Sequence, residues 1–127
     1  MSQLQTRPEK KHYKDLLVWQ KSLALVHETY ELTNDFPGRE RFGSADQMRR
    51  AAVSVPSNIA EGQAHHSTRE FVHYLRHSRG SLAELNTQML IAIDLKYVPQ
   101  PRGVSALQRM DEISRMLNGL IGSLTSD

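Results

Sequence analysis

The sequence predicts an all-α protein, an antiparallel up-down-up-down bundle of four helices. Apolar residues recur at steps of three and four along four stretches of the chain, which is the period of an α-helix with one buried face. No stretch shows the alternating pattern of a β-strand. Short segments rich in glycine or proline separate the four stretches, and short connections favour neighbouring helices that run in opposite directions.

Length and composition favour one domain. The chain of 127 residues can bury its own core, and it has no cysteine, which excludes disulfides and thiolate chemistry. No apolar run approaches the roughly 20 residues that span a bilayer, and the N-terminus lacks the apolar run of a secretory signal. We therefore expect a cytoplasmic protein with no membrane partner. Residues 1–12 are polar and basic, so we predict a flexible basic arm before a single domain at residues 13–127.

The first two helices are placed by their start signals and breaks. Asp15 is a suitable N-cap for the first, which ends before Phe36-Pro37-Gly38. Ser44 and Gln47 form a capping box for the second. The core positions expected in the first helix are Leu16, Trp19, Leu23, Val26, Tyr30 and Thr33. Those expected in the second are Ala45, Met48, Ala52, Val55, Ile59 and Gly62.

The last two helices carry the same signals. Ser67 with Glu70, and Ser105 with Gln108, form the capping boxes, and the proline-containing residues 99–103 separate the two helices. The core positions expected in the third helix are Phe71, Leu75, Ser78, Leu82, Leu85, Met89 and Ala92. Those expected in the fourth are Leu107, Met110, Ile113, Leu117, Leu120 or Ile121, and Leu124.

Pro56 falls inside the second predicted helix, where it removes the hydrogen bond to the carbonyl of Ala52 at a cost of about 3 kcal/mol. Either the helix kinks there, or two shorter helices meet at residues 54–56. Ser54, Ser57 and Asn58 could bond to the freed carbonyl, so we favour a single helix kinked at Pro56.

Some apolar residues lie off the expected core positions, and residues 90–93 are apolar nearly all round the third helix. A small bundle cannot hide every face of one helix, so we expect a second buried surface between subunits. A wide core stripe is the alternative. The residues concerned are Leu17, Leu25, Leu32, Val53, Leu90, Ile91 and Ile93.

A basic stripe is predicted on the first half of the third helix, roughly opposite its core positions, where Glu70 is the one acidic residue between positions 65 and 79. Such a line of cations suits nucleic-acid phosphates and gives salt-sensitive, sequence-independent affinity. A solvated outer face is the alternative, and we expect no aromatic platform for base-specific reading. The stripe consists of Arg69, His73, Arg76, His77 and Arg79, supplemented by Lys10, Lys11 and Lys14 near the N-terminus.

An ion pair between Arg50 and Glu84 is expected to hold the second and third helices together, because antiparallel placement brings these residues roughly opposite each other.

The sequence offers no catalytic framework. Glu70-Phe-Val-His73 matches one half of a di-iron bundle motif, but Glu70 is expected to serve the capping box, and no serine lies in Gly-x-Ser-x-Gly. There is no glycine-rich phosphate loop. We therefore expect a protein that is not an enzyme and that has neither a metal nor a cofactor.

The segment AAVSVPSNIAEG (residues 51–62) resembles the signature of the 23S rRNA intervening-sequence protein family, also called the four helix bundle protein family. DLLVWQK (15–21), RGSLAE (79–84) and Tyr97-Val98 follow the family pattern in order, so the resemblance covers about residues 13–124. Two departures are Lys96, where the family usually has glycine, and the turn QAHH (63–66). Within the signature, we expect structural roles for Pro56, Asn58 and Glu61.

The resemblance implies assembly as a homopentameric ring. Some relatives are encoded within rRNA intervening sequences, and a similar accessory protein of diversity-generating retroelements is thought to bind nucleic acid and a reverse transcriptase. Two hypotheses of function follow. One is an RNA-binding accessory protein that acts as a homo-oligomer through repeated Arg/His surfaces, and the other is a protein-interaction scaffold without a nucleic-acid role.

Overall fold

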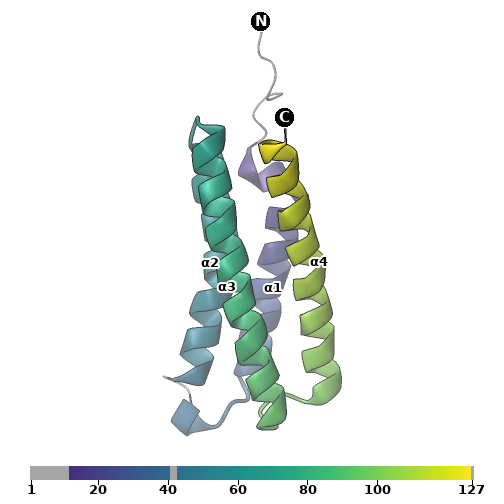
Figure 1. Ribbon diagram of the computed structural model, residues 1–127. Coiled ribbons are helices and arrows are strands. Elements are labelled where there is room, and N and C mark those ends of the chain that lie inside the picture. Colours follow the sequence, from purple (N-terminus) through teal and green to yellow (C-terminus); the bar gives the residue numbers. More distant parts are fainter. Residues whose placement is uncertain (1–11, 41–42, 127) are drawn as a thin grey trace, which may run out of the picture.

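The computed structural model describes residues 12–40 and 43–126. Within those ranges every regular element is helical, which confirms the all-α prediction (Figure 1). Two short 3-10 helices, η1 (Tyr13–Asp15) and η2 (Gly38–Glu40), precede α1 and α2. The four long helices are α1 (Leu17–Thr33), α2 (Ser44–Ala64), α3 (Thr68–Asp94) and α4 (Gln100–Thr125). The predicted basic arm, apart from His12, lies outside the described residues.

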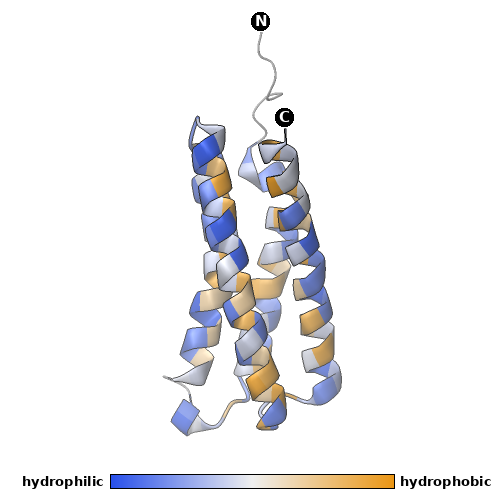
Figure 2. Ribbon diagram, viewed as in Figure 1, coloured by the Kyte–Doolittle hydropathy of each residue, from blue (hydrophilic) through white to orange (hydrophobic). Residues whose placement is uncertain are grey.

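The four helices lie side by side along their length (Figure 1). α2 contacts α1 and α3, and α4 contacts α3 and α1, so the helices follow one another around the bundle. Each helix carries both hydrophobic and hydrophilic residues, as a helix with one buried face requires (Figure 2). Among the described residues, no helix is both long and apolar enough to cross a membrane.

The core stripes predicted for α2 and α3 are confirmed, because every expected position is buried. In α4 the predicted core positions Met110, Ile113, Leu117 and Ile121 are buried, as are Gly103 and Ala106. Leu107, Leu120 and Leu124 are half-buried against the core.

The core stripe predicted for α1 is wrong except at Thr33, the one predicted position that is buried. The buried residues are Val18, Ser22, Leu25, Thr29 and Leu32, together with Thr33. The hydroxyl of Ser22 donates to the carbonyl of Val18 (2.7 Å), and that of Thr29 donates to the carbonyl of Leu25 (2.8 Å). Since each hydroxyl is satisfied within its own helix, it can be buried at little cost. Leu25 and Leu32, expected to be surplus surface, therefore belong to the core.

Of the predicted caps, only the one at Ser67 is confirmed. Its hydroxyl accepts a hydrogen bond from the amide of Glu70 (3.2 Å). Neither Leu16 nor Gly43, the N-caps of α1 and α2, makes a side-chain capping bond. α4 begins at residue 100, five residues before Ser105, because a proline in the first helical turn needs no amide donor.

The end of α3 is a Schellman motif centred on Lys96. The amide of Lys96 donates to the carbonyl of Ile93, and the amide of Tyr97 donates to that of Ala92, both at 2.9 Å. This geometry places Lys96 at φ 65°, in the left-handed region that glycine adopts without strain. Lys96 is the one described non-glycine residue with a positive φ. It stands at the position where the family usually has glycine, and the left-handed backbone there explains that preference.

Pro56 is buried inside α2, which forms one helix rather than two. The polar bonds nearby differ from those expected. The side-chain amide of Asn58 donates to the carbonyl of Ser54 (2.8 Å), and the hydroxyl of Ser78 on α3 donates to the carbonyl of Val55 (2.8 Å). They engage the carbonyls of residues 54 and 55 rather than that of Ala52.

Candidate nucleic-acid interface

Four of the residues predicted for the basic stripe share one exposed surface of α3. Arg69, His73, Arg76 and His77 are all exposed, and their spacing keeps them on the side away from the core. We call them the α3 basic face. Neither arginine forms an ion pair with another described residue. Their guanidinium groups are therefore free to donate to an anionic ligand.

Two shallow hollows border this face. Arg69, His73 and Arg76 line one of them with Leu124 and Thr125 of α4. His73, Arg76 and His77 line the other, which continues along α3 past residue 80. Both hollows are open to solvent, so the surface suits an extended ligand better than an enclosed small molecule.

Arg79 lies apart from the α3 basic face. Its guanidinium donates to the side-chain oxygen of Asn118 on α4 (2.9 Å). It lines a separate hollow between α3 and α4 together with Asp111. Lys14 is exposed and belongs to η1. The segment η1 lies at the end of the bundle where α4 terminates (Figure 1). Lys10 and Lys11 lie outside the described residues.

The interpretation of the sequence missed a group of aromatic rings beside the basic face. The ring of Tyr74 stacks on that of His65, with centroids 5.2 Å apart and planes at 17°. His73 packs edge-on against Tyr74 at 5.2 Å, and His77 packs edge-on against His73 at 4.6 Å. We call these four residues the aromatic cluster. Aromatic rings therefore lie beside the charges, where the sequence led us to expect no aromatic platform for base-specific reading.

The cluster could not be read from helical spacing alone. Tyr74 and His77 belong to α3, but His65 caps the end of α2, and the turn at residues 65–67 brings its ring onto Tyr74. Gly62 makes room there, because an added Cβ would lie 2.8 Å from the Cβ of Tyr74. Glu61 lies 3.7 Å from Nε2 of His65, at ion-pair distance when the imidazole is protonated.

The expected pair between Arg50 and Glu84 is wrong. Arg50 lies 3.3 Å from Asp46, one turn earlier on α2, and Glu84 accepts a hydrogen bond from Gln88 on α3 (3.4 Å). Each exposed side chain finds a partner on its own helix, where the spacing of four residues brings side chains together.

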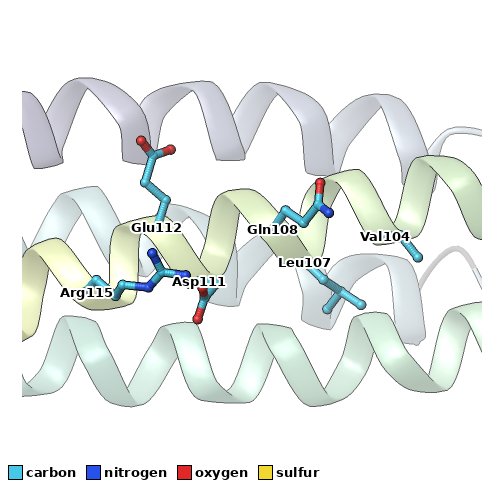
Figure 3. A pocket seen from close by; sticks show the side chains of 6 residues that line it. All are labelled: Val104, Leu107, Gln108, Asp111, Glu112 and Arg115. Atoms are coloured by element: carbon cyan, nitrogen blue, oxygen red, sulfur yellow. Dashed lines mark hydrogen bonds and ion pairs between the residues drawn. The ribbon is translucent and has the colours of Figure 1, made fainter.

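A further hollow lies on α4 (Figure 3). Asp111 and Arg115 form an ion pair there within the helix. Glu112 points toward the neighbouring helix in Figure 3 and pairs with Lys21 of α1 at 3.1 Å. The three charged side chains that line this hollow, Asp111, Glu112 and Arg115, all form ion pairs, so none of them offers an unpaired charge to a ligand. Over the part of the chain that the structure describes, no three His, Asp or Glu side chains could jointly hold a metal ion.

Fold and site together define an all-α four-helix protein with a basic and aromatic surface on α3. The model of the 23S rRNA-intervening sequence protein family matches residues 14–119, and the chain belongs to that family. A crystal structure of a protein of unknown function from the S23 ribosomal protein family of Bacteroides thetaiotaomicron has the same fold. Its TM-score is 0.77 at 22% identity, over 83% of this chain and 98% of that one. No curated protein matches.

Proposed function

We propose that this protein is a non-enzymatic accessory protein that binds RNA through the α3 basic face. The observation that carries the proposal is the free state of Arg69 and Arg76. Arg50, Arg109 and Arg115 each pair with a carboxylate. Arg69 and Arg76 are exposed on the side of α3 away from the core, and neither forms an ion pair with a described residue. Phosphate contacts need such unpaired cations at helical spacing.

We also propose that the protein works in the cytoplasm as a homo-oligomer, a homopentameric ring. Each subunit of the ring is an antiparallel bundle in which α2 is kinked at Pro56. Exposed apolar residues near the end of α3 support self-association, since Leu90, Ile91 and Leu95 are each about half exposed, at 51%, 51% and 54%. The hydroxyls of Ser54 and Ser81 lie 2.8 Å apart, and the hydroxyl of Ser78 lies 2.8 Å from the carbonyl oxygen of Val55. The later residue of α2 pairs with the earlier residue of α3, which supports opposite directions for these two helices. A ring would repeat the basic face, so that weak contacts add.

The test is binding of nuclease-treated protein to RNA by fluorescence anisotropy over a series of salt concentrations. We expect the logarithm of the binding constant to fall linearly with the logarithm of salt concentration. The double variant Arg69→Ala/Arg76→Ala should bind more weakly, with a slope reduced by roughly 1.4 to 1.8, because each phosphate contact contributes about 0.7 to 0.9.

Arg102→Ala is the matched control. Arg102 is an exposed arginine of α4 that forms no ion pair with a described residue, and it lies at the end of α4 that adjoins the end of α3. Its loss should leave the slope almost unchanged. Absence of binding at low salt would overturn the proposal, as would equal losses in the control and the double variant.

A protein-interaction scaffold is the second candidate, favoured by the same exposed apolar residues of α3. In that case the protein should co-purify with one specific protein at high salt, where phosphate contacts are screened. RNA binding should then be absent.

A further inference from the structure

We infer that the α3 surface takes unpaired nucleotides, whose bases stack on the aromatic cluster around Tyr74 while Arg69 and Arg76 hold the adjoining phosphates. This inference rests on the proposed function and adds the form of nucleic acid that the site accepts. It depends on the contact between the end of α2 and the first half of α3.

The two kinds of side chain lie on different sides of α3. Arg69 and Arg76 border the hollow toward the last turn of α4. Tyr74 lies on the other side, against His65 at the end of α2. His73 connects the two sides, because it borders the hollow of the arginines and also packs edge-on against Tyr74. A strand that crosses α3 at His73 can place phosphates on one side and bases on the other.

The rings lie at the surface and not in the core. His73 and His77 are exposed, and Tyr74 and His65 are half-buried. A base in a duplex is covered by its neighbours on both faces, whereas an unpaired base can stack on a protein ring. Stacking of this kind tolerates any base, because every base has a π-face. An aromatic surface beside unpaired arginines therefore selects the unpaired form without selecting a sequence.

The position of Tyr74 is set before any ligand arrives. The contact with Gly62 brings the two helices together at Tyr74, and stacking on His65 orients its ring. Glu61, 3.7 Å from Nε2 of His65, helps to hold that imidazole in place when it is protonated. A surface ordered in advance loses less conformational entropy on binding than a flexible one.

The experiment compares an unstructured RNA oligonucleotide with the same strand annealed to its complement. One adenine is replaced by 2-aminopurine, whose fluorescence is quenched by stacking. The wild-type protein should bind the single strand more tightly than the duplex and should change the 2-aminopurine signal at saturation. Tyr74→Leu, which keeps an apolar side chain, should weaken binding of the single strand roughly 5- to 100-fold and abolish that change. Its duplex affinity should stay the same.

Two variants serve as controls. Tyr74→Phe keeps the aromatic ring and should retain affinity within about threefold. Tyr30→Leu removes a tyrosine of α1 that is 43% exposed and also has an arginine beside it, with Cζ of Arg49 4.7 Å from the ring centroid. Since Tyr30 lies away from α3, this variant should bind like the wild type. Circular dichroism melts establish that each variant is folded.

The outcomes separate the two ideas. If folded Tyr74→Leu binds the single strand as tightly as the wild type, stacking on Tyr74 is wrong, while salt-dependent binding of either form would leave the proposed function standing. If the wild type binds neither form, the proposed function itself fails. Should Tyr74→Leu not fold, the wild type decides, because an unchanged 2-aminopurine signal at saturation overturns the inference.

Discussion

The hydroxyl of Ser78 donates a 2.8 Å hydrogen bond to the carbonyl oxygen of Val55, which directly precedes Pro56. Both residues are fully buried, and the bond joins α3 to α2. We expect Ser78→Ala to lower the free energy of unfolding by about 1–2 kcal/mol, because a buried hydrogen bond between the helices is lost. Urea denaturation measures the change. Ser123→Ala, which removes an exposed hydroxyl of α4, should cost less than about 0.5 kcal/mol. Equal losses would contradict this account.

Alanine substitutions at two helical glycines should have opposite effects. At Gly62 the new Cβ would lie 2.8 Å from the Cβ of Tyr74 and 3.2 Å from the carbonyl oxygen of Phe71. We expect Gly62→Ala to destabilise the protein by about 1–3 kcal/mol, since main chain must move. Nothing lies within 4 Å of a Cβ at Gly119 in α4. Gly119→Ala should therefore stabilise by about 0.5–1 kcal/mol through helix propensity alone. Thermal melts of both variants test the contrast.

Lys96→Gly should stabilise the protein. Lys96 has φ 65°, a conformation that costs a residue with a Cβ about 1–2 kcal/mol. Glycine avoids that cost but loses more freedom on folding, so we expect a net gain of about 0.5–1 kcal/mol in urea denaturation. Lys96→Ala is the control for the lost charge. It should give no gain, because alanine keeps the Cβ, and a gain equal to that of glycine would show that charge is responsible.

Two ion pairs of different burial should differ in strength. Arg109 of α4 lies 2.9 Å from Glu28 of α1, with side chains 37% and 20% exposed. Arg50 and Asp46 lie within α2, with side chains 78% and 39% exposed. Double-mutant cycles should give a coupling energy of about 1 kcal/mol for the pair between helices and about 0.3 kcal/mol for the pair within α2. A larger coupling for the exposed pair would contradict this order.

How well the core could be predicted differs from helix to helix. In α2 and α3 the buried positions are mostly apolar, so periodicity identified them. In α1 the buried face includes Ser22 and Thr29, whose hydroxyls bond to carbonyls of their own helix, while Trp19 and Val26 are only half-buried beside that face. Counting apolar residues therefore chose the flank of α1 instead of its core.

The candidate site was predicted only where it depends on one helix. The spacing of Arg69, His73 and Arg76 fixes their common face once residues 68–94 are helical. The position of Arg79 depends on Asn118 of a neighbouring helix, and the stacking of Tyr74 depends on the turn that returns the chain from His65. Such contacts arise from tertiary structure, which a helical period does not contain.

The last turn of α4 forms part of the wall beside Arg69 and Arg76, whereas the rings of the aromatic cluster come from α3 and the end of α2. Terminal turns of helices fray more readily than their interiors. Thr125 limits fraying here, since its hydroxyl donates back to the carbonyl of Ile121 (2.8 Å). Transient unwinding of that turn would change the surface next to the proposed phosphate contacts and would leave the stacked rings of Tyr74 and His65 in place. In the complex that we propose, affinity for the sugar–phosphate chain and preference for unpaired bases would therefore be adjustable by separate parts of the molecule.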